Sequence, residues 1–555
     1  MFDSKKKQLF TVASNSTVKS AFVQAGLKKS AETTSVKGAL KYSTTGNPGV
    51  DQFGKIGMYK QPRSFTQIVE DCETLWAWDK RLSVVFIFYL RTIVRIVKLF
   101  TGVSTKAAQK GAQLKHESIM RMMWLFTKSE ATFWKNIGLF VSLGSWKDII
   151  TMLQYDLVYH GWKDRVLNWE KFGDLLLSGL ENKQTSELIK KYLPQLRANS
   201  KCTTVESQAD NIIAKWICSL LYGNKESSVN YKKYRKLKAS GTAHEWQKLI
   251  SRKEFDRIDF NTIHGRALNL LVKGKFLYNS GLKDKYTKFV TDPDKKELKF
   301  TGFVHEVMDL CSIYYNIVSM PVHKQETCNK QFAELIKKGE GGEQTKFIVV
   351  RDTSGSMEGI ATGTNMSSGN IAKSIALYFS YFLKGQFADS WIEFNVEAQM
   401  KKWKGNTPVE KWFNDKSEYI GTTNFQSVID LFWDIKGQGV PEEDFPTGIL
   451  CISDGEFDPS SLNKTNVETA LDRLRRAGFS KDFVNNFVIV LWNIPHSRGS
   501  HGNKFETYGN VPNVYYFSGY EPSVITFLTG KIKNAEELFL AAMDQEILNM
   551  IELCW

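Results

Sequence analysis

Several signatures of enzymes and of metal–thiolate sites are missing from this sequence of 555 residues. It has no Walker A loop, no HExxH pair and no GxSxG context, so the usual motifs of nucleotide hydrolysis, zinc proteolysis and serine hydrolysis are absent. The seven cysteines are scattered, odd in number and without a CxxC pair. We therefore expect neither a disulfide framework nor a thiolate zinc site, and we expect a reducing compartment such as the cytoplasm. No enzymatic activity is predicted.

A membrane-spanning run is missing as well. The most apolar stretch, SVVFIFYL at residues 83–90, is followed at once by Arg91. A helix that crosses a bilayer needs about 20 apolar residues. This stretch therefore predicts a buried helix. The N-terminus has no uninterrupted apolar segment, so we expect no secretory signal and no membrane partner.

What the chain does have is an uneven charge distribution. Hydrophobic residues make up 42% of it and charged residues 24%, as in ordinary folded proteins. Residues 1–344 carry 55 basic and 33 acidic side chains, a net charge of +22, whereas residues 345–555 carry 19 and 26, a net charge of −7. The stretch GEGGEQ at 339–344 separates the two parts. Because the parts differ in sign, we expect different functions, with a polyanion as partner of the first.

The cationic part has the periodicity of helices. Apolar residues recur at spacings of three and four in segments such as SFTQIVEDCETLWAWDKRL, SELIKKYLPQLRA and ADNIIAKWICSLLYG. We predict an α-helical repeat domain at 61–338, a HEAT-like solenoid or ring in which each helix pair buries its apolar face on its neighbours. Residues 1–60 are rich in Ser, Thr, Lys and Gly. They predict a flexible basic arm, or a segment that becomes ordered only against a partner.

Residues 345–555 alternate between strands and helices. The segments TKFIVVRDTS, TGILCISDG and NNFVIVLWNI are near-continuous apolar strands, and SWIEFNVEAQMKKW alternates like one further strand. Helices such as NIAKSIALYFSYFLKG and NVETALDRLRRAG lie between them. The pattern predicts an α/β domain, Rossmann-like, with a mostly parallel sheet covered on both faces. Ligands of such sheets bind beyond the carboxyl ends of the strands.

Three short motifs follow the strands of this domain at that edge. They are Asp352-Thr353-Ser354-Gly355-Ser356, Gly421-Thr422-Thr423-Asn424 and Ser453-Asp454-Gly455. Together they supply two carboxylates and three hydroxyls, an all-oxygen set that suits Mg²⁺ or another hard divalent cation. The predicted metal ligands are Asp352, Ser354, Ser356, Thr423 and Asp454. The alternative is that these residues only form turns and caps at strand ends.

The constellation resembles the metal-ion-dependent adhesion site of von Willebrand factor A domains. The resemblance implies that Ser354, Ser356 and Thr423 contact the metal. It further implies that Asp352 and Asp454 act directly or through water, and that one coordination position is left for an acidic group of a partner. A metal held in this way is a docking point. Hydrolysis would also need a placed general base, which the motifs do not supply.

Longer segments are similar to the Ro autoantigen group of TROVE-type proteins, and particularly to its uncharacterised members. These segments are VRDTSGSM, IVLWNI, YYFSGYEPSVITFL, KNIGLFVSLGSWKDIITML and YKKYRKLKASGTAHEW. The similarity covers roughly residues 45–555, with the weight that any motif match has. It implies helical repeats that close into a basic ring, which binds ends of misfolded RNAs in its hole and structured RNA outside. A von Willebrand-like domain fastens the ring in that family.

The densest cationic patch lies in the region of this similarity. It consists of Tyr231, Lys232, Lys233, Tyr234, Arg235, Lys236 and Lys238. Cations interleaved with aromatic rings bind RNA backbone and stack bases. Tyr231 and Tyr234 are three residues apart, however, so the segment also fits a solvated helix face whose tyrosines pack inward. Both alternatives stay open at this point.

A second cationic group follows. It is the cluster Lys273, Lys275, Lys283, Lys285 and Lys288. His264 and Arg266 precede it at a predicted helix start, where backbone N–H groups favour a phosphate. For His264, a structural role as a half-buried, hydrogen-bonded side chain is the alternative.

Two functions of different classes follow from these patterns. The first is an RNA-binding protein of the Ro type, with a magnesium-dependent von Willebrand A-like domain for docking or ring closure. The second is a metal-dependent protein-interaction scaffold that binds no RNA. A hydrolase that uses the metal ranks below both, because its catalytic motifs are missing.

Overall fold

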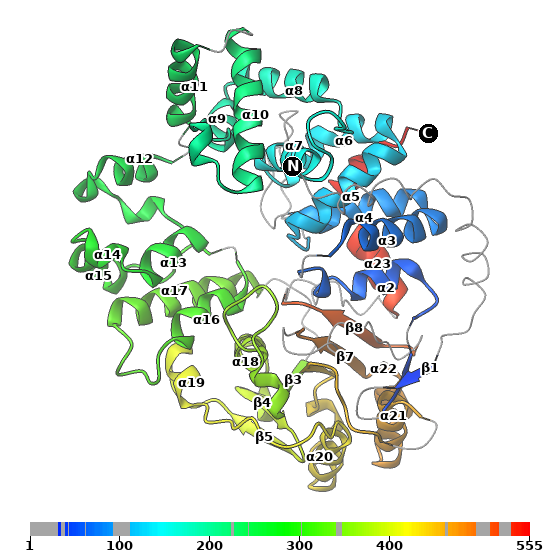
Figure 1. Ribbon diagram of the computed structural model, residues 1–555. Helices are drawn as coiled ribbons and strands as arrows, with labels where there is room; N and C mark the ends of the chain where they lie inside the picture. Colours follow the sequence, from blue (N-terminus) through cyan, green and yellow to red (C-terminus); the bar gives the residue numbers. More distant parts are fainter. Residues whose placement is uncertain are drawn as a thin grey trace. The chain divides into compact units, whose positions relative to one another are not determined.

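The structure is a computed structural model that describes residues 32–34, 39–42, 44–60, 63–92, 111–223, 227–241, 244–300, 302–339, 347–460, 464–495, 511–520 and 534–554. The chain forms two compact units (Figure 1). Unit 1 comprises Met1–Lys19, Pro62–Asp259 and Met543–Trp555, and unit 2 comprises Ser20–Gln61 and Phe260–Ala542. In this division the helices after residue 260 group with the sheet. The predicted domain boundaries at 338 and 345 stay a prediction.

Unit 1 consists mainly of helices that pack on one another. They are α3 (Phe65–Trp78), α4 (Lys80–Arg91), α5 (Lys115–Lys128), α6 (Glu130–Leu143), α7 (Lys147–His160), α8 (Trp169–Glu181), α9 (Ser186–Tyr192), α10 (Val205–Tyr222), α11 (Ser228–Ser240) and α12 (Glu245–Arg252). Side-chain caps start several of them; Ser64 and Gln67 form a capping box at α3. Neighbours in sequence such as α3, α4 and α5 pack on one another. The helix-rich character predicted for this region is confirmed.

The apolar run at 83–90 lies within α4, and all eight of its side chains are buried. Arg91, at the end of the helix, is also buried and forms an ion pair with Asp148 of α7 at 2.7 Å. The prediction of a buried helix is confirmed. No helix within the described ranges combines the length and the apolar character that crossing a bilayer requires.

The C-terminal tail is fixed to α6 by hydrogen bonds between side chains of the helix and the backbone of the tail. Asn136, buried at 2% exposure, donates through Nδ2 to the carbonyl of Glu552 at 2.6 Å and accepts at Oδ1 from the amide of Glu552 at 2.9 Å. Thr132 donates to the carbonyl of Cys554 and accepts from its amide. Two backbone units of the tail are therefore hydrogen-bonded to one face of the helix.

Replacing Asn136 with alanine is expected to release this tail. The partly buried hydrogen bonds to the amide and carbonyl of Glu552 would both be lost, each at a cost of about 0.5–1.5 kcal/mol. Hydrogen exchange measured by mass spectrometry should show at least roughly tenfold faster exchange in the peptide that contains Glu552. Asn549→Ala is the control, because Asn549 lies in the same segment and is exposed. Unchanged protection in Asn136→Ala would show that the tail is held by other contacts.

Unit 2 begins with a segment that was predicted to be flexible. Within the predicted arm, Pro48–Gly54 forms helix α2, whose residues are largely buried. Asn47 caps the helix, Phe53 packs edge-on against Phe517 at 6.3 Å, and the amide of Gly57 donates to Ser518 Oγ at 2.8 Å. The arm prediction is therefore wrong for residues 47–60, because an Asn-Pro cap and one aromatic anchor fix them to the sheet. Residues 1–31 lie outside the described residues.

Further helices of unit 2 precede the sheet. They are α13 (Gly265–Lys273), α14 (Phe276–Asn279), α15 (Lys283–Thr291), α16 (Val304–Ser312) and α17 (Val322–Gly339). α16 and α17 pack on each other, and α16 also packs on α18 (Ser368–Ser380), one of the helices that cover the sheet. These helices thus share a core with the α/β part of the unit.

The sheet has six strands in the order β5-β4-β3-β6-β7-β8. Their bounds are β3 Phe347–Asp352, β4 Ser390–Phe394, β5 Ala398–Lys402, β6 Gly448–Ser453, β7 Val488–Asn493 and β8 Val514–Ser518. All neighbours are parallel except β4 and β5, which form an antiparallel hairpin at one edge. The single strand predicted at 390–403 is therefore two strands. Asn395 makes the turn between them, as this residue type often does in turns.

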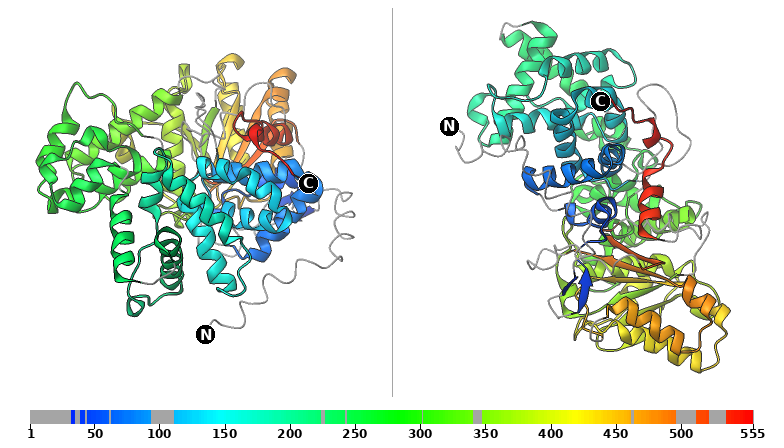
Figure 2. Two further views of the ribbon diagram at one scale, coloured as in Figure 1. Left: turned by 90° about the horizontal axis from the view of Figure 1, so that it is seen from above. Right: turned by 90° about the vertical axis from the view of Figure 1, so that its right-hand side faces the viewer.

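Helices cover both faces of this sheet, as predicted. One face is covered by α20 (Gln426–Gly437), α21 (Asn466–Arg476) and α22 (Lys481–Asn486) (Figure 2, right). These helices bury alternate strand residues such as Ile348, Val350 and Ile449. On the other face, α18 packs on β3, β4 and β6. The alternation of side chains along a strand explains why these strands are apolar at nearly every position.

Candidate metal centre and basic surface

The strand order places the candidate metal ligands at a topological switch point. From β3 the chain continues to β4 on one side and returns to β6 on the other. Ligands of open α/β sheets bind in the crevice at the carboxyl ends of such a strand pair. Asp352 is the last residue of β3, and Asp454 directly follows β6. Both carboxylates are therefore on the two strands that flank the switch.

A row of polar residues crosses the sheet at this edge. Ser453 is in register with Asn493, and Asn493 with Ser518, across β6, β7 and β8. Ser453 donates through Oγ to Oδ2 of Asp352 at 2.5 Å and accepts from the amide of Gly455 at 3.0 Å. The Ser453 hydroxyl thus connects the Asp352 carboxylate to the loop that carries Asp454. Ser453 is not among the predicted ligands, although its place at the end of a strand was the available signal.

The loop after β3 brings both serines to the same place. The amide of Ser354 donates to Oδ1 of Asp352 at 2.8 Å, and the Ser354 and Ser356 hydroxyls lie 3.1 Å apart. Asp352 and Ser354 are buried, whereas Ser356 is exposed. The cluster is therefore open to solvent on the Ser356 side, where a partner group would approach.

Thr423 reaches this edge on a different loop. Its amide donates to Oδ2 of Asp458 at 3.1 Å, and the amide of Asp458 donates to the carbonyl of Thr423 at 2.9 Å. These two hydrogen bonds tie the loop before α20 to the loop after β6. The amide of Ile420 also donates to the carbonyl of Thr353 at 2.9 Å, which ties the Thr423 loop to β3. Asp458 is a positioning residue that the sequence did not identify.

The electrostatics of the site favour a bound cation. Burial, and next the charge of Asp454, raise the pKa of Asp352 from 3.8 to about 7, although Ser453 and Ser354 donate hydrogen bonds to it. Two buried carboxylates that repel each other are stabilised by a positive charge between them. No group of three or more His, Cys, Asp or Glu side chains is placed to hold a metal in the part of the chain that the structure describes. The candidate set has only two carboxylates, and hydroxyl oxygens complete it, which is chemistry that Mg²⁺ accepts.

A buried cationic network supports the same edge from the opposite face of β3. Arg351 lies 3.9 Å from the centre of the Trp391 ring and forms an ion pair with Asp415 at 2.7 Å; Lys373 lies 3.4 Å from Asp415. Although burial opposes it, the charges of Arg351 and Lys373 hold the pKa of Asp415 well below its usual range. Asp415 begins the loop that leads to Thr423. The network therefore fixes the start of that loop.

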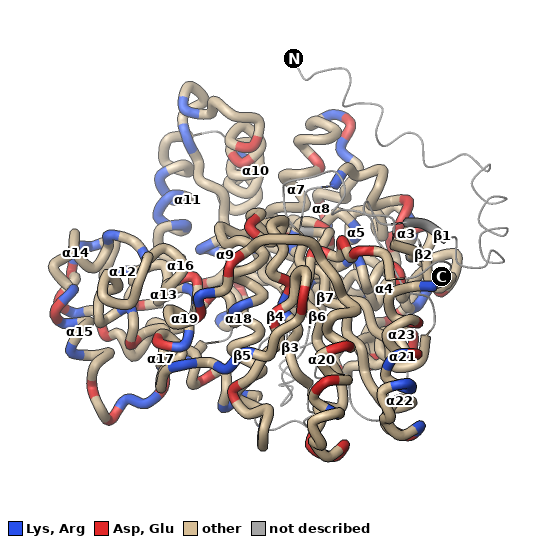
Figure 3. Tube along the Cα trace, turned by 90° about the horizontal axis from the view of Figure 1, so that it is seen from below, with Lys and Arg blue, Asp and Glu red and all other residues tan. Residues whose placement is uncertain are grey.

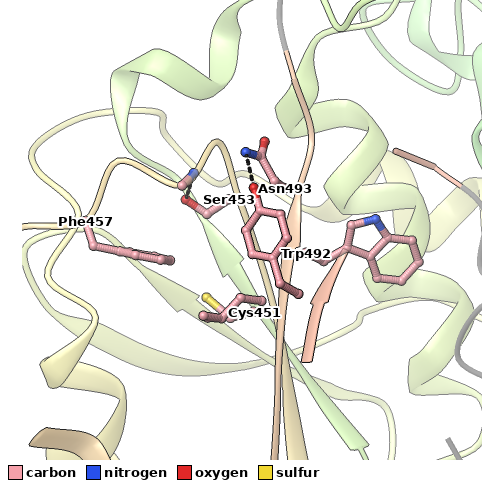
Figure 4. Close-up of a pocket in the computed structure, with 8 residues that line it drawn as sticks. Cys451, Ser453, Phe457, Trp492 and Asn493 are labelled. Carbon is pink, nitrogen blue, oxygen red and sulfur yellow. Dashed lines mark hydrogen bonds between the residues drawn. The ribbon is translucent and has the colours of Figure 1, made fainter. Parts of the chain in front are cut away.

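A small cavity lies beside the polar row (Figure 4). The centre of a water molecule can occupy about 10 Å³ of this cavity, so the cavity has room for roughly one water. Asn493 donates to the hydroxyl of Tyr516 at 2.9 Å in its wall, and Ser453 and Cys451 also line it. The cavity is too small for a substrate. What the edge offers chemically is a cluster of carboxylate and hydroxyl oxygens that is open to solvent at Ser356.

The predicted RNA-binding patch forms α11 of unit 1, and the structure divides its residues into two groups. Tyr234 is buried and donates its hydroxyl to the carbonyl of Pro194 at 2.9 Å. Arg235 donates through Nε to the carbonyl of Leu196 at 3.4 Å, and Lys238, whose pKa is lowered by burial, donates to the carbonyl of Leu193. These three residues attach the helix to the segment after α9. For Tyr234 the inward-packing alternative is confirmed.

The remaining lysines of α11 face solvent. Lys232, Lys233 and Lys236 are exposed, and Lys233 lies 5.7 Å from the centre of the Tyr222 ring. Figure 3 shows the positive charges that follow one another along this helix. Because Tyr234 and Lys238 fix the helix from below, the three exposed ammonium groups are presented from a rigid base.

The other predicted RNA-binding residues lie in α13 of unit 2 or beside its ends. Arg266 forms an ion pair with Glu306 at 2.7 Å, and Lys273 forms one with Asp309, both across to α16. His264 is exposed at the N-cap, but the first amide of the helix, at Gly265, donates to the carbonyl of Lys299 at 3.0 Å. Lys275 is exposed. Two of the four residues therefore hold α13 on α16, and a phosphate would have to compete for them.

The fold and the site define a class: an α/β domain with a six-stranded, mostly parallel sheet and a cluster of carboxylate and hydroxyl oxygens at its switch point. A family model described as Domain of unknown function (DUF7788) matches residues 346–550, which include all six strands. That description names no activity. No curated protein matches the chain.

Proposed function

We propose that this chain is an RNA-binding protein of the Ro type, in which cationic helices bind RNA and the α/β domain holds a divalent cation for docking. The TROVE-like solenoid or ring and the von Willebrand factor A-like character of the sheet domain are part of this proposal. So is a cytoplasmic location, which the seven free cysteines support. We propose no enzymatic activity.

The metal half of the proposal rests on the convergence of Asp352 and Asp454 at one edge. Asp352, Ser354, Ser356, Thr423 and Asp454 would hold Mg²⁺. When bound, the cation would neutralise the two carboxylates and offer a positive position to an acidic side chain of a partner. Ser453 and Asp458 orient the groups around it. The proposed function of this edge is docking, since the cavity beside the polar row is of water size.

Magnesium is expected to stabilise the protein against unfolding. A ligand that binds only the folded state at about 100 times its dissociation constant contributes about 2.7 kcal/mol. Thermal unfolding in a Mg²⁺ series should show a saturable rise of the transition temperature of the α/β domain, reversed by EDTA. Na⁺ at equal ionic strength is the control for screening. If Mg²⁺, Mn²⁺ and Ca²⁺ all leave the transition temperature unchanged, the metal half of the proposal is refuted.

The RNA half rests on the three exposed lysines of α11. Phosphate groups attract such a surface whatever the sequence of the RNA, and the attraction weakens steeply with salt. Binding of a structured RNA and of a 3′-tailed RNA should be measured by mobility shift over a salt series. Binding whose logarithm falls linearly with the logarithm of salt concentration supports the proposal, and no binding at low salt contradicts it.

A second candidate function is a metal-dependent protein-interaction scaffold that binds no RNA. The ion pairs of Arg266 with Glu306 and of Lys273 with Asp309 favour it, because these cations are already neutralised within the protein. Chelation distinguishes the candidates. If EDTA releases a protein partner and no RNA binds at low salt, the scaffold is the correct function. If RNA binds with and without EDTA, RNA binding is independent of the metal edge.

A further inference from the structure

An exposed aromatic platform lies on the loop between α7 and α8 of unit 1. The Trp162 side chain is 42% exposed, and the guanidinium carbon of Arg165 lies 4.4 Å from the centre of its ring. Arg165 also donates through Nη1 to the carbonyl of Trp162 at 3.1 Å. These two residues, together with Lys163, Asn168 and Glu170, line a hollow, an open surface depression of about 480 Å³.

The platform is built on a rigid base. Asp156 of α7, fully buried, accepts hydrogen bonds from the amide of Val166 at 2.9 Å, the amide of Leu167 at 3.2 Å and the indole N–H of Trp169 at 2.8 Å. One carboxylate therefore fixes the loop after Trp162 and the start of α8. A loop that is fixed in this way loses little conformational entropy when a ligand binds.

Indole rings continue from the platform into the core. Trp162 contacts Trp169 edge-to-face with ring centres 5.1 Å apart, and Trp169 contacts Trp216 of α10 in the same way at 4.7 Å. Trp169 is buried, whereas Trp162 ends the series at the surface. Packing accounts for the two inner rings. The outer ring also packs on Trp169, and Arg165 lies over both rings, but 42% of Trp162 stays open to a ligand.

The chemistry of the hollow selects the ligand. Flat π systems stack on indole rings and on guanidinium planes, and unpaired nucleobases are the biological groups that use both. The guanidinium of Arg165 already lies over the Trp162 ring, which disfavours a second cation there, such as a methylated ammonium group. Lys163 and Arg165 are the cations that line the hollow and Glu170 is an anion that lines it, so a phosphate chain gains only a small net attraction. A base held mainly by stacking fits this balance.

We propose that Trp162 and Arg165 form a stacking site for one unpaired base of single-stranded RNA. The inference rests on the proposed RNA binding of unit 1 and adds a contact of a different physical kind. Lysines of α11 attract phosphates, whereas Trp162 and Arg165 bind a base face. The first contribution depends on salt, and the second does not.

Trp162→Ala is expected to weaken binding of a single-stranded oligonucleotide roughly tenfold, within the range for loss of one stacked base. The slope of log affinity against log salt should stay unchanged. Trp162→Tyr should restore most of the affinity, because it restores a stacking face. Trp433→Ala is the matched control, an equally exposed tryptophan at 43% on α20 of unit 2. A photoreactive thiouridine oligonucleotide should crosslink to the peptide that contains Trp162.

The outcomes separate this inference from the proposed function. If RNA binds with steep salt dependence but Trp162→Ala binds as well as the parent and no crosslink forms there, the stacking site is refuted and the proposed function stands. If affinity falls and Trp162→Tyr does not restore it, the role of Trp162 is structural and the stacking site is refuted. If the parent protein binds no RNA at low salt, the proposed function fails and the site fails with it.

Discussion

Replacing Asp352 with asparagine is expected to weaken Mg²⁺ binding by at least about 100-fold, since even residues that only support metal ligands cost 10- to 100-fold. Asparagine keeps the acceptor for the Ser354 amide and can donate to Ser453 Oγ, so the loop geometry is preserved. Only the negative charge is lost. Isothermal titration of the purified full chain with MgCl₂ measures the effect.

The sign of the stability change makes this prediction sharper. Without metal, Asp352→Asn removes the repulsion between the two buried carboxylates, so the metal-free variant should unfold at a higher temperature than the metal-free parent. With saturating Mg²⁺ the order should reverse, because only the parent gains binding energy. A merely structural aspartate would give a variant that is less stable in both conditions.

Asp444→Asn is the matched control for this experiment. Asp444 is an exposed acid shortly before β6, at the amino end of the strand whose other end leads to Asp454. It should leave Mg²⁺ affinity and both transition temperatures unchanged. Equal losses in the two variants would assign the effect to net charge rather than to the site, and would overturn the docking proposal.

The position of this site followed from local sequence because its residues directly adjoin strands. Parallel strands bring their carboxyl ends to one edge, so a motif after β3 and a motif after β6 had to meet once the strands were assigned. The polar residues that support the ligands were harder to find. Asp458 reaches Thr423 across 35 residues, and nothing in the local pattern of SDGEFD marks it as a partner of that loop.

The charge pattern predicted the cationic surface less well. A lysine on a helix has the same sequence context whether it faces solvent or a carbonyl group. Lys238 differs from the exposed Lys236 because it donates a hydrogen bond to the carbonyl of Leu193, 45 residues earlier. Lys273 forms an ion pair with Asp309 on another helix. The segment at α2 is a similar case, because the contact of Gly57 with Ser518 spans 461 residues. Such partners follow from tertiary packing, which periodicity does not encode.

Replacing Lys232, Lys233 and Lys236 together with alanine is expected to reduce RNA affinity about 100-fold at moderate salt. Each phosphate contact to a single strand contributes about 0.7 to the slope of log affinity against log salt, so the slope should become shallower by about 2. The fold should be preserved, because Tyr234, Arg235 and Lys238 hold α11 and stay in place. Fluorescence anisotropy with a labelled oligonucleotide over a salt series measures affinity and slope together.

A control with the same change of net charge distinguishes a binding surface from a general field. Lys402, Lys404 and Lys416 are exposed in the α/β domain, and their replacement by alanine removes the same three charges. If α11 contacts phosphates, this variant should keep the parent slope and lose little affinity, since it leaves the three lysines of α11 in place. If the slope becomes shallower by the same amount in both triple variants, the net positive charge, rather than α11, attracts RNA. An unchanged slope in the α11 variant alone would place the phosphate contacts elsewhere on the chain and leave these lysines as a solvated helix face.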